Sequence, residues 1–200
     1  MYLPTYLNVL TCLLPLTSLA MSDQAQTVLD DISSLQKSLD SNEQALSQYK
    51  GGLISAAPLA NEFYNTWSTL RVANDHVPAD TNFTSEESDE VLHGMDSAND
   101  VAIGLFKSVK EKAQMLNKAG AGFTVPIFMD ALYREADEYM GALKALMPLN
   151  YTPPMDQITA SHTKFWNAAF ASFEPADTSN STRQFKRFTS MATPLLGYFF

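Results

Sequence analysis

The chain has 200 residues, 46% of them hydrophobic, and a formal net charge of −9. This length is within the range of a single domain that is stabilised by its own hydrophobic core. Because phosphate backbones attract basic surfaces, the acidic balance excludes nucleic acid as an expected partner and argues against charge-driven binding to anionic membranes.

Residues 1–20 have the composition of a secretory signal peptide. They contain no Asp, Glu, Lys or Arg, and they end in Ser18-Leu19-Ala20, a small-x-small cleavage pattern. A buried N-terminal helix is the alternative, although Pro4 and Pro15 interrupt the apolar run and it is too short to span a bilayer. The sequence therefore predicts cleavage after Ala20 and an extracellular, secreted protein.

Residues 21–176 form the predicted folded domain. The only cysteine, Cys12, precedes this domain, so the mature protein is expected to fold without disulfides and to carry no reactive thiol. No other stretch is long and apolar enough to cross a membrane, so the protein is not expected to be transmembrane.

Apolar residues recur at steps of three and four along most of this domain, which is the period of an amphipathic α-helix. The pattern predicts helices over about 27–49, 53–74, 85–119, 124–147 and 155–173. No stretch alternates with the period of two that is typical of strands. These patterns predict an all-α fold, an antiparallel bundle of about five amphipathic helices.

The clearest helix start in the sequence is at Thr84. Thr84 and Glu87 have the spacing of a capping box, in which each side chain accepts a hydrogen bond from the backbone of the other. Acids crowd the beginning of this helix and lysines crowd its end, which matches the helix dipole.

Two surface features are predicted outside the helices. Asn82 and Asn180 begin N-x-S/T glycosylation sites in expected loops, whereas the similar site at Asn150 is less attractive because Pro153 follows it. Residues 177–200 are expected to be a flexible C-terminal tail. A cleaved lipid-anchor signal is the alternative for this tail, but its apolar end is too short.

No catalytic motif is present in the sequence. There is no G-x-S-x-G, H-E-x-x-H, Walker or G-x-G-x-x-G pattern, so neither an enzyme activity nor a cofactor is expected. The acids at 86–90 are interpreted as the solvated start of a helix. A metal site formed by these acids with His93 is the less favoured alternative. His162 lies on an apolar face and is expected to be a packing residue with its hydrogen bonds satisfied.

Several stretches together resemble a known family. These are Asp31-Ile32 with the leucines that follow it, Gly51-Gly52-Leu53, the acid-capped helix after Thr84, and Val125-Pro126-Ile127. Over about 27–173 the chain resembles the fungal hydrophobic surface-binding protein A family, which includes the ligand-binding domains of antigenic cell-wall galactomannoproteins.

The resemblance implies a five-helix fold, secretion or cell-wall residence, and no enzyme activity. It also implies two functions. The first is binding of a fatty acid or other apolar small molecule in a cavity between the helices. The second is adsorption to hydrophobic surfaces, with recruitment of secreted hydrolases. A small secreted hydrolase is the remaining alternative.

Large aromatic and methionine side chains within the helices are the candidate lining of an apolar cavity, although the same stripes would equally fill a solid core. The candidate ligand-binding residues are Phe63, Trp67, Leu70, Met95, Phe106, Leu132, Tyr139, Phe165 and Trp166. A buried unpaired carboxylate is costly, so a fatty-acid head group is expected at the pocket mouth or beside hydroxyls and a lysine.

Overall fold

The computed structural model describes residues 21–52, 54–79, 81–122 and 124–173. The predictions for residues 1–20, for Asn180 and for the tail at 177–200 lie outside these ranges. The described residues form five α-helices: α1 (Asp23–Gln48), α2 (Ala57–His76), α3 (Ser85–Lys118), α4 (Thr124–Leu146) and α5 (Thr152–Phe170). Short 3-10 turns lie at Ile54–Ala56, Leu149–Tyr151 and Ala171–Phe173. No strand occurs in these ranges, so the predicted all-α fold of five helices is confirmed.

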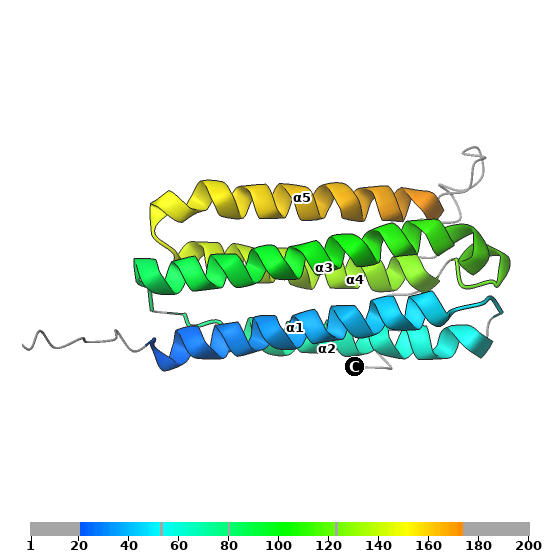
Figure 1. Ribbon diagram of the computed structural model, residues 1–200, viewed down its shortest axis with the longest axis horizontal. Helices are drawn as coiled ribbons and strands as arrows, with labels where there is room; N and C mark the ends of the chain where they lie inside the picture. Colours follow the sequence, from blue (N-terminus) through cyan, green and yellow to red (C-terminus); the bar gives the residue numbers. More distant parts are fainter. Residues whose placement is uncertain (1–20, 53, 80, 123, 174–200) are drawn as a thin grey trace, which may run out of the picture.

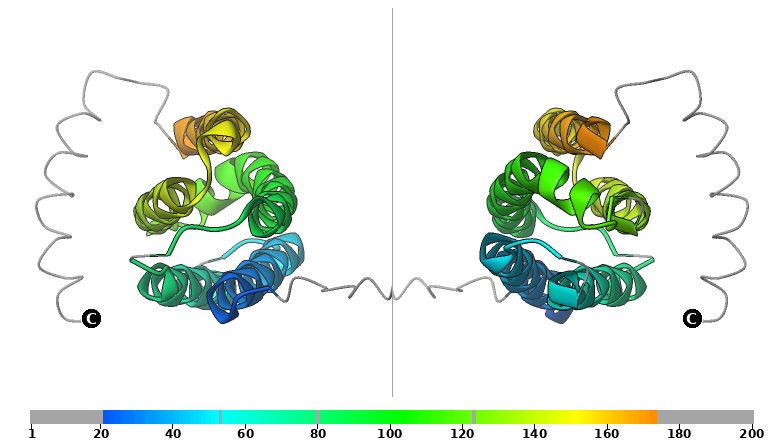
Figure 2. Two further views of the ribbon diagram at one scale, coloured as in Figure 1. Left: turned by 90° about the vertical axis from the view of Figure 1, so that its left-hand side faces the viewer. Right: turned by 90° about the vertical axis from the view of Figure 1, so that its right-hand side faces the viewer.

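The helices run along one long axis, and each runs opposite to the one before it (Figure 1). Viewed from the end, α1 and α2 form one layer, α3 and α4 a second, and α5 lies on the outer side of the second layer (Figure 2). The helix pairs in close contact are α1 with α2 and α3, α2 with α4, and α5 with α3 and α4. The described parts of α3 and α4 are not in such close contact, although one short loop joins them.

The capping box predicted at the start of α3 is confirmed. The Thr84 hydroxyl accepts a hydrogen bond from the Glu87 backbone N–H at 3.2 Å, and the Glu87 carboxylate accepts one from the Thr84 N–H at 2.9 Å. The other oxygen of Glu87 accepts a hydrogen bond from the Ser22 N–H at 2.8 Å. One side chain therefore joins the beginnings of α1 and α3.

Three helix starts differ from the sequence prediction. α1 begins at Asp23 rather than near residue 27, because the Ser22 hydroxyl caps it by accepting from the Ala25 N–H. α2 begins at Ala57, after a 3-10 turn, with a proline in its first turn. α5 begins at Thr152, because Pro153 and Pro154 occupy its first turn, where missing N–H groups are tolerated.

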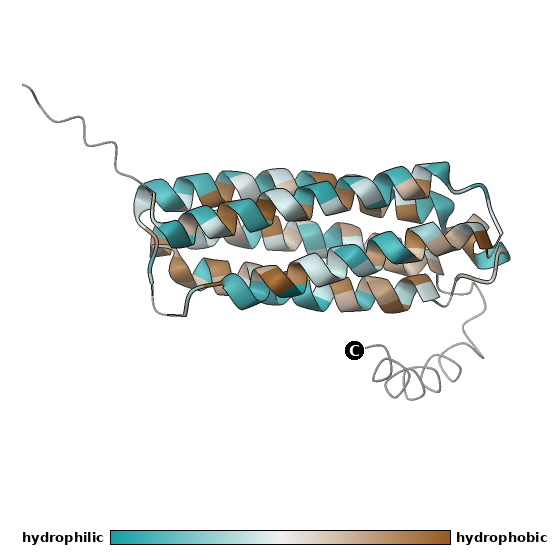
Figure 3. Cartoon of the chain, turned by 90° about the horizontal axis from the view of Figure 1, so that it is seen from below, coloured by the Kyte–Doolittle hydropathy of each residue, from teal (hydrophilic) through white to brown (hydrophobic). Residues whose placement is uncertain are grey.

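Hydrophilic and hydrophobic residues alternate along every helix at the short intervals that amphipathic helices require (Figure 3). The apolar residues make one continuous core that includes Leu46, Leu70, Leu105, Met129 and Leu143. Among the helices described, none combines the length and the apolar composition needed to cross a membrane.

Candidate functional site

An apolar cavity of about 60 Å³ lies at the centre of the bundle, and all five helices contribute to its wall. We call it the central cavity. Its lining residues are Leu35, Leu39, Thr66, Leu70, Met95, Ala98, Asn99, Ala102, Leu105, Phe106, Leu132, Tyr133, Ala136, Tyr139, Met140 and His162. Small side chains face this space from the two helices that stand apart, Ala98 and Ala102 from α3 and Ala136 from α4. A methyl group fills less volume than the branched side chains of a solid core, so these alanines leave the space between α3 and α4 open.

A second apolar cavity, of about 170 Å³, lies at the end of the bundle where α2 and α4 begin and α3 ends. We call it the end cavity. Its lining residues are Ala56, Ala57, Leu59, Ala60, Phe63, Leu116, Ala121, Thr124, Val125 and Phe128.

The two cavities are close neighbours. Phe63 of the end cavity and Thr66 of the central cavity are three residues apart on α2. On α4, Phe128 lines the end cavity and Leu132, four residues further along, lines the central cavity. A rise of about 1.5 Å per residue places these walls about one helical turn apart.

The cavity walls can change shape more easily than most cores. Pockets for drug-sized ligands have volumes of roughly 300–1,000 Å³, so neither cavity as it stands would enclose a long acyl chain. Met95 and Met140 line the central cavity. Their unbranched, flexible side chains adapt to irregular apolar shapes, so an apolar ligand could displace them at small cost.

Three polar atoms belong to buried side chains of the central cavity and have no hydrogen-bond partner in the described ranges. They are Asn99 Oδ1, the Tyr139 hydroxyl and His162 Nε2. His162 is therefore a packing residue, as predicted, but the prediction that its hydrogen bonds are satisfied is wrong. Its ring packs edge-on against Phe106, with the ring centroids 5.1 Å apart. Burial lowers the pKa of the His162 imidazole to about 4, so the ring is neutral at physiological pH.

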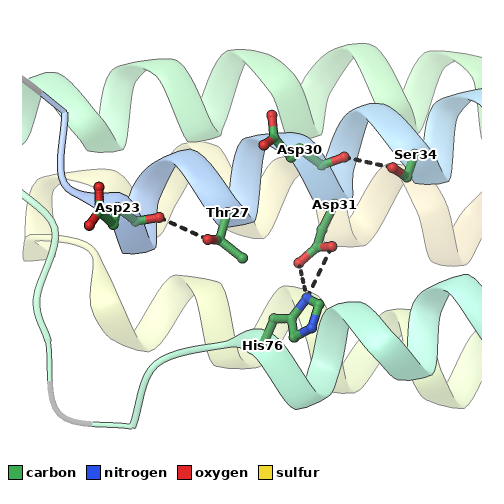
Figure 4. Close-up of polar contacts among 6 residues, drawn as sticks. All are labelled: Asp23, Thr27, Asp30, Asp31, Ser34 and His76. Atoms are coloured by element: carbon green, nitrogen blue, oxygen red, sulfur yellow. Dashed lines mark hydrogen bonds and ion pairs between the residues drawn. The ribbon is translucent and has the colours of Figure 1, made fainter.

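Among the residues that the structure describes, the wall of the central cavity contains no lysine or arginine side chain. A lysine partner for a carboxylate, expected from the sequence, is therefore absent from this wall. Burial, and secondarily the negative charge of Asp31, raise the pKa of the Tyr139 hydroxyl. Asp31 belongs to α1 and accepts a hydrogen bond from Nδ1 of His76 on α2 at 3.0 Å (Figure 4).

A polar cleft of about 440 Å³ separates parts of α3 and α5. We call it the acidic cleft, because Asp89, Asp96 and Asp100 contribute to its wall together with His93. The described residues contain no group of three His, Cys, Asp or Glu side chains that could hold a metal ion. Asn99 lines both this cleft and the central cavity, so it marks the place where the two are closest.

The structure divides the nine candidate ligand-binding residues into three groups. Those on the central cavity are Leu70, Met95, Phe106, Leu132 and Tyr139. Phe63 lines the end cavity. Trp67, Phe165 and Trp166 line neither cavity, and all three are only partly buried against the edge of the core.

Specific contacts account for the positions of these three outer rings. Trp166 donates from Nε1 to the Met129 carbonyl at 3.2 Å. The guanidinium of Arg71 lies over the Trp67 ring, 4.9 Å from its centroid. The ammonium of Lys107 lies 5.1 Å from the centroid of Phe165. Contacts between cations and aromatic faces are favourable at the protein surface.

Sequence reasoning identified Tyr139 but missed the small residues and the other polar residues of the central cavity. Ala98, Ala102 and Ala136 occupy the predicted apolar stripes, but an alanine in a stripe does not reveal whether a larger neighbour fills the space beside it. The only available signal for the polar residues was the position of His162 and Asn99 at helical spacing from apolar residues.

Comparison with known proteins identifies the family. The sequence model described as hydrophobic surface binding protein A matches residues 25–145. The chain belongs to this family. No significant match exists among the curated proteins.

Solved structures share its fold. AFMP4P, solved in complex with palmitic acid, is 19% identical, with a TM-score of 0.72, over 75% of this chain and 99% of that one. Ligand binding domain 1 of the Penicillium marneffei MP1 protein, solved with arachidonic acids, is 12% identical, with a TM-score of 0.72, over 76% and 99%. Domain 2 of the same protein, solved with multiple arachidonic acids, is 14% identical, with a TM-score of 0.69, over 76% and 96%.

Proposed function

We propose that this protein binds a long-chain fatty acid or a related apolar molecule between its helices, as a non-catalytic protein. The observation that carries this proposal is the central cavity, an apolar space at the meeting point of all five helices. Its family membership and the fatty acids bound by proteins of the same fold support it.

The energetics of such binding are favourable. Burying about 15 methylenes at about 0.8 kcal/mol each gives a gross gain of about 12 kcal/mol. Association and ordering costs remove a substantial part of this gain, which leaves affinity on the order of micromolar.

A long chain would need both apolar cavities. The wall between them includes Phe63 and Phe128 on the end-cavity side and Leu132 on the central side. Rotation of these side chains would join the two spaces into one channel along the bundle axis. The ligand-binding role of Leu70, Met95, Phe106 and the other candidate residues of the two cavities is part of this proposal.

The wider biology proposed for the chain follows from its sequence features. We propose that residues 1–20 are a signal peptide, so that the protein is secreted and resides outside the cell, either free or in the cell wall. Asn82 is exposed in the loop before α3, which supports its use as a glycosylation acceptor. Sequencing the secreted protein from its N-terminus should give Met21 first, and an intact Met1 would contradict the proposal.

Adsorption to hydrophobic surfaces is the second candidate function. The observation that favours it is Ile54, whose side chain is 91% exposed in the turn that leads into α2 beside the end cavity. Opening of the bundle at this end would expose the apolar core to a hydrophobic surface. The partners that the family suggests on such a surface are secreted hydrolases.

A chain-length series separates the two functions. Native mass spectrometry of the secreted protein should detect about one lipid per chain. The ring centroids of Trp166 and Tyr133 are 4.4 Å apart, and Tyr133 lines the central cavity. The fluorescence of Trp166 should therefore change when a ligand fills this cavity. Affinity for fatty acids should rise with chain length, reach a maximum and then fall. Affinity that keeps rising with length and follows micelle formation would support surface adsorption instead.

A further inference from the structure

Three helices each contribute one unpartnered polar atom to the wall of the central cavity. Asn99 belongs to α3, Tyr139 to α4 and His162 to α5, and each residue is more than nine-tenths buried. A buried polar atom without a partner destabilises the fold, and nearly all such atoms in native proteins have one. Three of them around one apolar space therefore point to a ligand that supplies their hydrogen bonds.

The other hydroxyls of the same wall already have partners. Tyr133 pairs its hydroxyl with Thr163 Oγ1 at 3.2 Å. Thr66 donates to the Glu62 carbonyl at 3.1 Å and accepts from Asn42 Nδ2. Within the described cavity wall, Asn99, Tyr139 and His162 therefore differ from the paired hydroxyls, whereas the two other unpartnered buried atoms, Asn42 Oδ1 and Asn74 Oδ1, belong to residues outside this wall.

The charges around these atoms disfavour an anionic ligand. The negative charge of the Asp31 carboxylate on α1 acts on the Tyr139 hydroxyl. Behind Asn99, the acidic cleft contains Asp96 and Asp100. A carboxylate among these groups would be buried with no cationic partner in the lining and with negative charges nearby, which is a costly arrangement.

We propose that the central cavity selects a lipid whose head group is an uncharged hydroxyl, such as a fatty alcohol, over an ionised fatty acid. A hydroxyl can donate to Asn99 Oδ1 or to His162 Nε2 and can accept from the Tyr139 hydroxyl, whereas a carboxylate has no proton to donate. This inference rests on the proposed lipid-binding function and specifies its ligand class.

Three ligands with the same chain test the head group on the full-length secreted protein. They are 1-dodecanol, laurate at pH 7.5, and 1-methoxydodecane, which accepts but cannot donate a hydrogen bond. We expect 1-dodecanol to bind about tenfold or more tightly than laurate and about twofold to tenfold more tightly than the ether, the range that one hydrogen bond supplies. This comparison needs no variant.

A pair of matched variants tests the assigned residues. Tyr139→Phe should weaken binding of both 1-dodecanol and the ether about twofold to tenfold, because each ligand oxygen accepts a hydrogen bond from the Tyr139 hydroxyl. Tyr64→Phe removes a hydroxyl from an exposed ring on α2 that lines neither cavity, so it should leave the 1-dodecanol affinity near the wild-type value. Thermal unfolding of both variants checks that each folds.

The outcomes separate this inference from the function on which it rests. Laurate binding as tightly as 1-dodecanol would overturn the head-group proposal and leave the lipid-binding function intact. Equal effects of Tyr139→Phe and Tyr64→Phe would overturn the assignment of Tyr139. Absence of saturable binding by all three ligands would contradict the proposed function itself.

Discussion

His162 links the interior of the central cavity to the stability of the fold in acid. Its imidazole is buried, and burial lowers its pKa from 6.5 to about 4. In the unfolded chain the ring takes up a proton as the pH falls through 6.5, whereas in the folded chain it does so only near pH 4. Since the unfolded state then binds more protons, stability that is present above pH 6.5 is lost between pH 6.5 and 4.

We therefore predict that acidification from pH 7 to 4 lowers the free energy of unfolding by up to about 3 kcal/mol through His162 alone. Urea unfolding at pH 7, 5.5 and 4 would measure the change. His162→Leu should reduce this acid sensitivity, and His93→Gln, which changes an exposed histidine on α3, should retain it. Equal acid sensitivity in the wild type and His162→Leu would show that other groups control the transition.

The same residue shows where sequence reasoning about the site stops. An apolar stripe predicts that His162 is buried, but whether Nε2 finds a partner depends on α3 and α4, which are distant in sequence. Ala102 and Ala136 present the same difficulty, because a missing volume belongs to the gap between two helices and to no single residue. Large rings such as Trp67 and Phe165 are conspicuous in sequence, yet they lie at the edge of the core.

At the scale of the elements, the helix starts show which signals are local. The start of α3 was predictable because Thr84 and Glu87, which form its cap, are three residues apart. The start of α1 was predicted about four residues too late, although its cap is also local, since the Ser22 hydroxyl accepts from the Ala25 N–H three residues further along. A capping box with two reciprocal partners thus predicts a helix start more clearly than a single serine does.

The contribution of Glu87, which joins the beginnings of α1 and α3, can be tested directly. Hydrogen bonds from Ser22 and from the backbone of Thr84 hold the pKa of its carboxyl at about 2, so it stays ionised at ordinary pH. We predict that Glu87→Ala lowers the free energy of unfolding by about 1–2 kcal/mol, the usual cost of losing a helix cap. Amide exchange should also accelerate at Ser22 and Thr84.

Glu90→Ala is the matched control, since Glu90 is an exposed glutamate one turn further along α3. It should change the free energy of unfolding by less than about 0.5 kcal/mol. If the two variants unfold alike, the contact between the starts of α1 and α3 contributes nothing measurable.

At the scale of the whole molecule, two apolar cavities follow from how the layers meet. The layer of α1 and α2 packs closely against α3 and α4, and α5 packs against both of these from the other side. Since α3 and α4 themselves stand apart, the volume between them is filled by side chains alone. An arrangement of this kind can admit a ligand by moving side chains, with the helix contacts on both sides preserved.

Filling each cavity in turn should show how much of the molecule a ligand occupies. Ala102→Leu narrows the central cavity, and Ala60→Leu narrows the end cavity. If one chain spans both spaces, Ala102→Leu should weaken binding of fatty acids or alcohols of every length by about tenfold or more, a loss of about 1.4 kcal/mol. Ala60→Leu should weaken only the longer ligands, so that the best chain length becomes shorter.

Ala145→Leu serves as the control for this last comparison, because Ala145 is exposed on α4 and lines neither cavity. Overpacking a core costs typically about 1–3 kcal/mol, so urea unfolding must show that each variant remains folded at the assay temperature. Titration of all three variants with chains of increasing length gives one affinity profile for each. If the profiles of both cavity variants coincide with that of the wild type, the ligand binds outside these cavities. A shorter optimal chain length in Ala60→Leu alone would mean that the acyl chain runs along the bundle axis, from the centre to the end where α2 and α4 begin.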